Sequence, residues 1–253
     1  MKKDTMSLAG LIPAVVLSMG ALAVPGGASD LPPAEKVLAR YAEAIGGEAL
    51  AGIKNMKAEL EFEMPTQGVY ATAEEFWVRP DSFYFRIDLA AMGVSDFETG
   101  VLEGMAWQSH PMAGTRRLSG DEGAAALRRA ALNPFEGWKE QFETAETVAE
   151  EVVGERACYK VVLTPAEGAP LSSYFDKETG FLVRQELGGD TGPRMVTDLG
   201  DYQETQGIVS ARTVETKGPE SFTLKYTTVA YDVEDIPEDT FELPTSLQAT
   251  AGQ

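Results

Sequence analysis

The stretch that most constrains this chain is residues 173–186, Ser-Tyr-Phe-Asp-Lys-Glu-Thr-Gly-Phe-Leu-Val-Arg-Gln-Glu. Two short apolar runs flank a polar segment, in which Asp176 is able to bond the backbone that follows it and Gly180 is free to adopt a positive φ. This pattern is typical of a tight β-hairpin. Similar runs at residues 158–164 and 194–202 are separated from the hairpin by Gly and Pro. The second half of the chain is therefore predicted to be an antiparallel meander.

The first half carries a second strand pattern. Residues 56–64 alternate between apolar side chains, beginning at Met56, and charged side chains, which predicts a strand with one wet face. Residues 69–78 and 83–89 extend this pattern, and two shorter runs follow at 97–102 and 105–108. These runs predict a first meander ahead of the hairpin.

Two helical segments accompany the strands. A leading helix is predicted to start at the Asp30 cap with Pro32-Pro33 and to end at Gly46-Gly47. Its apolar stripe consists of Val37, Leu38, Tyr41 and Ile45. Residues 121–132 predict a helix between the meanders, and Phe135, Trp138 and Phe142 follow at helical spacing. The short segment 110–114 is predicted to be a loop.

No linker or repeat divides the chain, so one domain over residues 29–253 is predicted, with a flexible tail at 245–253. Its fold class is mainly β (α+β). About ten strands form a large curved antiparallel half-barrel, and a few helices cover it. A barrel-like sheet of more than about eight strands leaves an interior that its own side chains need not fill. The helices are then free to cover the open mouth.

The amino end predicts export. Lys2-Lys3 precedes an apolar run at residues 8–24 and a cluster of small residues, which is typical of a signal peptide over residues 1–28 with a membrane anchor as the alternative. Cleavage is expected after Ala28 or Ala23. Neither site has a cysteine beside it, so a lipidated amino terminus is not expected.

Charge and cysteine content exclude several classes of function. The formal charge is −19, which disfavours nucleic acid and anionic membrane surfaces as partners. The single cysteine, Cys158, has no internal disulfide partner and is expected to be a buried small apolar side chain.

Enzymatic signatures are weak. His110 precedes a proline in a predicted loop, and Ser172 and Ser173 lack a nucleophile-elbow pattern. Adjacent carboxylates such as Glu74-Glu75 and Glu150-Glu151 point to opposite faces of a strand and do not converge. The sequence carries no metal-binding or phosphate-loop motif, so we predict no enzyme, no cofactor and no metal. Catalysis by scattered carboxylates is the weakest alternative.

Several short motifs together resemble the outer-membrane lipoprotein-sorting (LolA-like) superfamily. They are Ala44-Ile45-Gly46-Gly47, Met56-Lys57, the run from Tyr174 to Arg184, Asp201-Tyr202 with Gly207-Ile208, and Phe241-Glu242-Leu243-Pro244. The likeness spans nearly all of the mature chain. It departs after Ile208, where relatives often continue with a Pro-Phe-type strand. The resemblance implies a periplasmic half-barrel with a helical lid that shields acyl chains in transit.

An acyl chain gains about 0.8 kcal/mol per buried methylene, so a chain of about fifteen methylenes represents about 12 kcal/mol. A groove lined by apolar side chains is able to bury these methylenes. The predicted lining residues come from wide-faced strands and the lid, although plain core packing is the competing role for each. They are Leu60, Phe62, Phe83, Phe85, Ile87, Leu89, Met92, Trp107, Met112, Leu127, Phe135 and Trp138. Arg79, Arg86, Arg116 and Arg117 are candidates for head-group contacts or for pinning lid loops, with surface ion pairs as the commoner role.

Two functions follow as hypotheses. The first is a non-enzymatic periplasmic carrier, expected to be a monomer, which binds lipid or lipoprotein acyl chains under a lid for transport towards the outer membrane. The alternative is a sensor or interaction module of the same fold, which binds a lipid or an envelope protein and signals to an inner- or outer-membrane protein partner.

Overall fold

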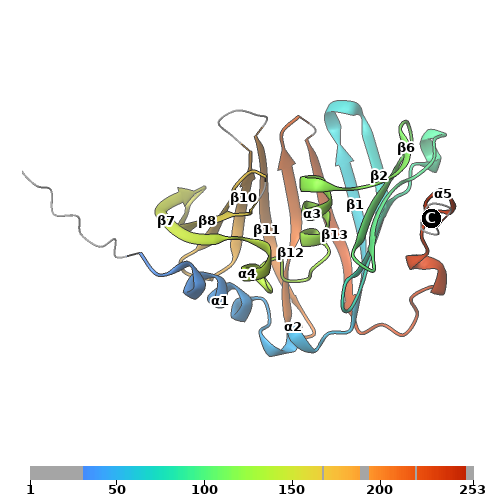
Figure 1. Cartoon of the computed structure of the whole chain (residues 1–253). Coiled ribbons are helices and arrows are strands. Elements are labelled where there is room, and N and C mark those ends of the chain that lie inside the picture. Colours follow the sequence, from blue (N-terminus) through green and yellow to red (C-terminus); the bar gives the residue numbers. More distant parts are fainter. Residues whose placement is uncertain (1–30, 167, 189–193, 220, 249–253) are drawn as a thin grey trace, which may run out of the picture. The chain divides into compact units, whose positions relative to one another are not determined.

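The computed structural model describes residues 31–166, 168–188, 194–219 and 221–248. The predicted signal peptide, residues 1–28, lies outside these ranges. Thirteen antiparallel strands form one continuous open sheet in the described part of the chain (Figure 1). The predicted fold class, a curved half-barrel with a few helices, is confirmed. The number of strands is three higher than the approximate ten expected from the sequence.

The first meander contains six strands, and five of them match the predicted runs to within a few residues. They are β1 (Asn55–Met64), β2 (Val69–Val78), β3 (Ser82–Ile87), β4 (Phe97–Leu102), β5 (Met105–His110) and β6 (Gly114–Arg117). The sixth, β6, was not predicted. Its sequence, Gly-Thr-Arg-Arg, lacks apolar alternation because it is a mostly exposed strand at the edge of the sheet.

The second meander contains seven strands. They are β7 (Thr144–Val153), β8 (Arg156–Thr164), β9 (Leu171–Asp176), β10 (Leu182–Leu187), β11 (Met195–Thr205), β12 (Ile208–Lys217) and β13 (Phe222–Tyr231). Every strand pairs with its neighbour in sequence, as expected of a meander.

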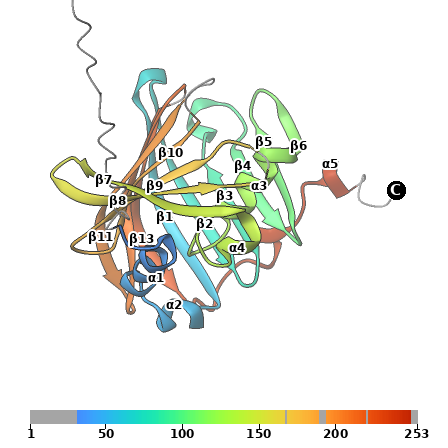
Figure 2. The same cartoon turned by 60° about the vertical axis from the view of Figure 1, so that its left-hand side comes forward.

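The two meanders join at β1 and β13, which pair from Met56↔Tyr231 to Glu63↔Thr223. This pairing places the first and last strands at the centre of the sheet, and it leaves β6 and β7 as the two edges. Since β6 and β7 are consecutive along the chain, residues 118–143 must cross from one edge to the other. We call this segment the crossing segment. It contains α3 (Gly120–Arg129) and α4 (Trp138–Gln141), which lie over the open side of the sheet (Figures 1 and 2).

The leading helix is α1 (Ala34–Ala44), followed by the short α2 (Glu48–Gly52). The predicted stripe is confirmed, since Val37, Leu38, Tyr41 and Ile45 are all buried. The helix begins after Pro33, and the predicted cap Asp30 lies outside the described residues. The remaining short helices are η1 (Pro65–Gln67), η2 (Ala90–Met92), η3 (Glu238–Phe241) and α5 (Thr245–Gln248).

The β9–β10 hairpin has the predicted turn chemistry. The Asp176 carboxylate accepts hydrogen bonds from the backbone N–H groups of Glu178 at 2.7 Å and Thr179 at 3.4 Å, and Gly180 has a φ of 82°. The turn also contacts α1, because the Arg40 guanidinium donates to the carbonyl oxygens of Lys177 and Glu178, both at 2.7 Å. The hairpin therefore fixes α1 against the second meander.

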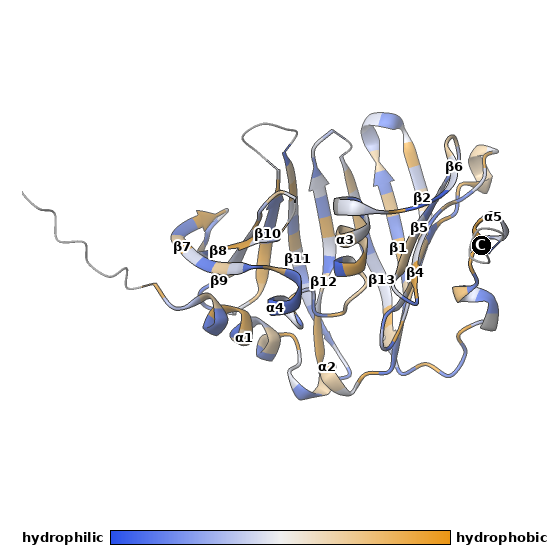
Figure 3. Cartoon of the chain, viewed as in Figure 1, coloured by the Kyte–Doolittle hydropathy of each residue, from blue (hydrophilic) through white to orange (hydrophobic). Residues whose placement is uncertain are grey.

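The two faces of the sheet follow the alternation of the sequence. In β1, Met56, Ala58, Leu60 and Phe62 are buried, whereas Glu59 and Glu61 are exposed. Figure 3 shows hydrophobic and hydrophilic residues interspersed along the strands of the sheet. The apolar side chains face the concave side, where the crossing segment and α1 lie. None of the described helices is long and apolar enough to cross a membrane.

Candidate functional site

A large cavity occupies the concave side, between the sheet and the crossing segment. Its volume is about 1190 Å³, which exceeds the range of about 300–1,000 Å³ typical of small-molecule sites. Both meanders contribute apolar side chains to its wall. These include Phe62, Met64, Phe83, Phe85, Ile87 and Leu89 from the first meander and Leu182, Leu199, Val214, Phe222 and Leu224 from the second.

The crossing segment forms the cover of the cavity. Leu118, Ala125, Ala126 and Leu132 contribute to the lining from this side. The alanines of α3 are small, so the helix leaves room beneath it for a bulky ligand. One end of the cavity is lined by residues of α1 and α2 and the connection between them, among them Tyr41, Ile45 and Leu50.

The cover is fastened to the sheet at several points. The Trp77 indole N–H on β2 donates to the carbonyl oxygen of Ala130, directly after α3, at 2.6 Å. Farther along, the Phe135 ring lies 5.5 Å from that of Tyr41 on α1 and 5.4 Å from that of Phe175 on β9. Phe135, Tyr41 and Phe175 form what we call the aromatic anchor, because they join cover, helix and sheet.

Replacing Trp77 by phenylalanine is expected to loosen the cover. The ring still fills most of its space, but the carbonyl oxygen of Ala130 loses its donor. A net hydrogen bond is worth about 1 kcal/mol, so a bound acyl probe should dissociate about fivefold faster. Stopped-flow displacement measures this rate, with Trp138→Phe as the control at a partly exposed tryptophan. Equal rates for Trp77→Phe and wild type would contradict a fastening role.

A bidentate ion pair holds the start of the cover. The Arg116 guanidinium donates to both carboxylate oxygens of Glu122, at 2.7 and 2.5 Å. The hydrogen bond from Arg116 holds the pKa of the Glu122 carboxyl below its usual value. Because the folded-state pKa is lowered, the pair's contribution to stability is present at neutral pH and is lost as pH falls through the lowered pKa.

The stabilisation by this pair should therefore disappear in acid. At pH 7, Glu122→Gln should melt at a lower temperature than wild type, by a small amount because both groups are half exposed. At about pH 3, below the ordinary pKa of glutamate, the difference between the two melting temperatures should be much smaller than at pH 7. Thermal melts at both pH values measure the difference, and a gap that persists at low pH would sink the idea.

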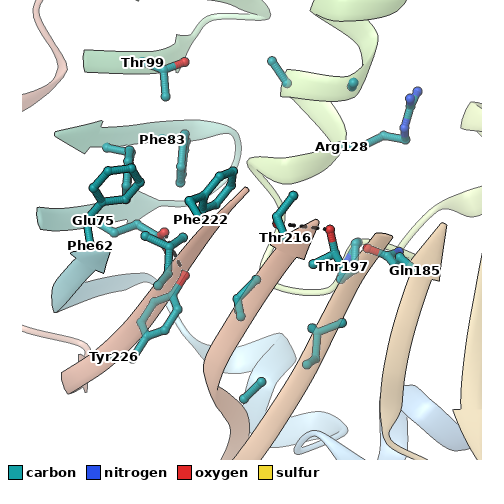
Figure 4. Close-up of a pocket in the computed structure, with 18 of the residues that line it drawn as sticks. Phe62, Glu75, Phe83, Thr99, Arg128, Gln185, Thr197, Thr216, Phe222 and Tyr226 are labelled. Atoms are coloured by element: carbon teal, nitrogen blue, oxygen red, sulfur yellow. Dashed lines mark hydrogen bonds between the residues drawn. The ribbon is translucent and has the colours of Figure 1, made fainter. Parts of the chain in front are cut away.

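Polar groups interrupt the apolar wall at two places. On β10, β11 and β12, Gln185, Thr197 and Thr216 lie opposite one another in register, with the two threonine hydroxyls 3.3 Å apart. Nearer β2, the Tyr226 hydroxyl donates to the Glu75 carboxylate at 3.1 Å. Figure 4 shows the two polar sites on opposite sides of the view, with Phe62, Phe83 and Phe222 beside Glu75. Arg128 of α3 also lines the cavity.

Seven of the twelve predicted lining residues line this cavity. They are Phe62, Phe83, Phe85, Ile87, Leu89, Met92 and Met112. Whether they contact a ligand stays a prediction.

The other five predicted residues lie elsewhere. Leu60 is buried on the same face of β1 as Phe62 but does not line the cavity, and Phe135 belongs to the aromatic anchor. Trp138 is partly buried against the core, whereas the side chain of Leu127 is 41% exposed. Trp107 is on the opposite face of β5 from Gln108 and His110, and it lines a smaller pocket beneath residues 235–244. A strand residue one position out of phase points to the other face, which places Trp107 away from the cavity.

The sequence analysis did not predict that several further residues line the cavity, notably Glu75, Phe222, Tyr226 and Arg128. The signal for Glu75 was present in β2, because Ala71, Ala73 and Trp77 are at the same phase of the alternation. Only the register shows that this phase faces inward, since Ala73 lies opposite Leu60 of β1.

Side chains with reactive groups have structural partners. Cys158 is buried, as predicted, and burial raises the pKa of its thiol. His110 is exposed at the end of β5, and its Nδ1 accepts a hydrogen bond from the Met112 N–H at 3.1 Å. The prediction that Glu74 and Glu75 diverge is confirmed, because Glu74 pairs with Arg86 at 2.9 Å while Glu75 lines the cavity. Within the described ranges, no three His, Cys, Asp or Glu side chains are grouped to hold a metal ion.

The four arginines proposed from the sequence differ in role. Arg79 donates through Nε to the carbonyl oxygen of Ile53 at 2.9 Å and stacks on Trp77. Arg86 and Arg116 form ion pairs, Arg86 with Glu74 and Asp96. Arg117 is exposed at the sheet edge. Arg86 and Arg116 thus have the commoner role expected from the sequence, a surface ion pair, and the pair of Arg116 joins β6 to α3.

No protein-family model matches this sequence, and no curated protein matches it either. Solved structures do match. A LolA superfamily protein, NE2245 from Nitrosomonas europaea, superposes with a TM-score of 0.58 at 13% identity, covering 84% of this chain and 99% of that one. The fold is LolA-like. This confirms the resemblance drawn from the short motifs as far as the fold is concerned.

Two further solved structures are similar to this chain. A DUF1329 family protein from Desulfovibrio piger has the same architecture, with a TM-score of 0.57 at 15% identity over 84% of this chain and 98% of that one. The MucA/MucB complex of Pseudomonas aeruginosa also matches, at 16% identity over 83% of this chain and 61% of that one, but with a TM-score of 0.29. A score this low carries no argument about partners. The LolA-like fold of this chain thus rests on the first two matches.

Proposed function

We propose that this protein is a non-enzymatic periplasmic carrier, which shields the acyl chains of a lipid or lipoprotein during transit towards the outer membrane. The observation that carries the proposal is the cavity of about 1190 Å³, walled by apolar side chains of both meanders and covered by α3. Each methylene transferred from water into such a wall gains about 0.8 kcal/mol. The predicted signal peptide at residues 1–28 and the LolA-like fold support the location.

The wall suits ligands of variable shape. Met64, Met92 and Met112 line the cavity together with several phenylalanines. Methionine is flexible and polarisable, so it repacks readily against different chains. The part of the chain that carries out this role is residues 29–253, acting as a monomer.

Native mass spectrometry of residues 29–253, purified gently from an exporting host, tests the proposal. The expected result is a co-purifying lipid or lipopeptide of defined mass. A protein that arrives without ligand and then binds no fluorescent acyl probe, lipid or lipopeptide would contradict the carrier function.

A second candidate function is a sensor that binds a lipid and signals to a protein partner. The observation that favours it is the apolar rim of the cavity, where Met92, Val94 and Met112 are 50%, 41% and 85% exposed. Such a rim suits contact with a partner or a membrane. Capture of one stoichiometric membrane protein without delivery of ligand would favour the sensor, whereas transfer of lipid between vesicles would favour the carrier.

A further inference from the structure

Three neutral polar side chains form a row across the second meander. Gln185 of β10 lies opposite Thr197 of β11, which in turn lies opposite Thr216 of β12, and all three line the cavity (Figure 4). We call these three residues the polar row. The described strands β10, β11 and β12 contribute no charged side chain to the lining of the cavity. The wall at this place is therefore polar but uncharged.

The hydrogen bonds within the polar row leave donors unused. The hydroxyl oxygens of Thr197 and Thr216 lie 3.3 Å apart, and one hydrogen bond between them uses the proton of only one hydroxyl. The Gln185 amide nitrogen donates one of its two hydrogens to the Ser173 hydroxyl, at 3.4 Å. Among the described residues these side chains have no other hydrogen-bond partner. One hydroxyl proton and one amide N–H thus remain to be donated.

Another threonine of the same cavity differs in this respect. Thr99 of β4 also lines the wall, but its hydroxyl donates to the carbonyl oxygen of Trp107 at 2.8 Å. The proton of Thr99 is therefore used within the sheet. A donor that is covered by a bound ligand without receiving an acceptor is unfavourable. The polar row consequently favours a ligand that places an acceptor there over one that places a methylene there.

The polar row lies near one end of the sheet. The ladder between β12 and β13 ends at the pair Thr216 and Phe222. One layer farther into the cavity, Leu199, Val214 and Leu224 lie opposite one another and line the wall. A ligand whose polar group lies at the row is thus able to extend its tail inward over apolar side chains.

Resting on the proposed carrier function, we infer that the polar row is a subsite for the acyl carbonyl group of the ligand, as an ester or an amide. With Thr216 donating to Thr197, the Thr197 proton is left for the ligand beside the Gln185 amide. Side chains directly opposite in an antiparallel pair are about 5 Å apart, so a carbonyl oxygen with two lone pairs accepts from both. The Gln185 side-chain oxygen is left to accept the N–H of an amide ligand.

A pair of matched ligands tests the subsite. Methyl hexadecanoate and hexadecyl methyl ether differ only by C=O against CH₂, and each competes with the fluorescent probe N-phenyl-1-naphthylamine for residues 29–253. The measured quantity is the ester-to-ether affinity ratio of each variant relative to wild type, because the difference in hydration between the two ligands then cancels. A net hydrogen bond corresponds to about fivefold in affinity. Thr197→Val and Gln185→Leu should each lower the ratio about fivefold.

Thr213→Val is the matched control. It removes the same hydroxyl from the neighbouring strand on the other face of the sheet, opposite Gly200 and Lys225. Its ester-to-ether ratio should equal that of wild type. Binding of the ether, which needs no hydrogen bond from the row, shows in every variant that the cavity is intact.

A third ligand, N-methylhexadecanamide, identifies the source of the carbonyl. If Gln185→Leu weakens the amide more than the ester, the subsite is suited to an acyl amide, because the Gln185 oxygen also accepts the amide N–H. Equal weakening indicates an acyl ester, such as that of a glycerolipid. Both results support a carbonyl subsite.

The remaining outcomes separate the subsite from the carrier function. An ester-to-ether ratio that is the same in wild type, Thr197→Val and Gln185→Leu would overturn the subsite and leave the carrier standing, since both ligands still bind. A ratio that falls equally in Thr213→Val would overturn it as well. Failure of the probe and of every ligand to bind the wild-type protein would overturn both.

Discussion

Replacing Phe135 by alanine is expected to lower the free energy of unfolding by about 3–5 kcal/mol. Phe135 is only 4% exposed, and its ring contacts Tyr41 of α1 and Phe175 of β9. Its removal leaves a cavity where three elements meet, and each aromatic contact adds about 0.5–1.5 kcal/mol beyond area burial. Urea denaturation followed by circular dichroism measures the change.

A control on the same crossing segment separates anchoring from ligand contact. Leu127→Ala removes an exposed side chain from α3 and should change stability by less than about 0.5 kcal/mol. A partial truncation, Phe135→Leu, should fall between Leu127→Ala and Phe135→Ala. If Phe135→Ala instead kept wild-type stability and lost only ligand affinity, Phe135 would be a lining residue and the aromatic anchor would be wrong.

Replacing Val214 by aspartate is expected to weaken acyl binding by at least about 100-fold. Val214 lies on β12 in the cavity wall, opposite Leu199 and Leu224. A bound chain would cover the new carboxylate, and removing that charge from water costs more than the roughly 3 kcal/mol that corresponds to a 100-fold loss. Because Val214 is only partly buried, the ligand-free fold should tolerate the change. Probe titration measures the affinity.

Thr213→Asp is the matched control for Val214→Asp. It places the same charge one residue earlier on β12, on the other face, opposite Gly200 and Lys225. Both variants place an aspartate in the same strand, but Thr213→Asp faces Lys225 across the ladder whereas Val214→Asp faces the cavity. The control should bind the probe as wild type does. Equal affinities in the two variants would show that acyl chains do not occupy this part of the cavity.

The strands were largely predictable because their signal is local. In β1 the alternation from Met56 to Met64 identifies the strand and its buried face without any knowledge of its partners. The turn between β9 and β10 was also predictable from its residue types. The Asp176 carboxylate accepts a hydrogen bond from the backbone N–H of Glu178, and Gly180 adopts the positive φ that the turn requires. The strand β6 was missed for the same reason, because an exposed edge has no apolar period to detect.

The candidate site was only partly predictable. Phe62, Phe83 and Phe85 follow from alternation, and they do line the cavity. Trp107 is equally apolar and aromatic, but its side chain is on the face of β5 that points away from the cavity. Phe135 packs in the aromatic anchor and does not line the cavity. Apolar character alone does not distinguish a side chain that fills the core from one that lines an open space.

The sequence by itself determined most of the strands, the leading helix, the helical segment between the meanders and the LolA-like resemblance, because periodicity and turn chemistry act between near neighbours. Only the tertiary structure decided that β1 pairs with β13, which makes β6 and β7 the edges and forces residues 118–143 across the open side. It also decided that Glu75 meets Tyr226, which is 151 residues away. Contacts of this kind depend on register and curvature, which are properties of the whole sheet, so no local pattern records them.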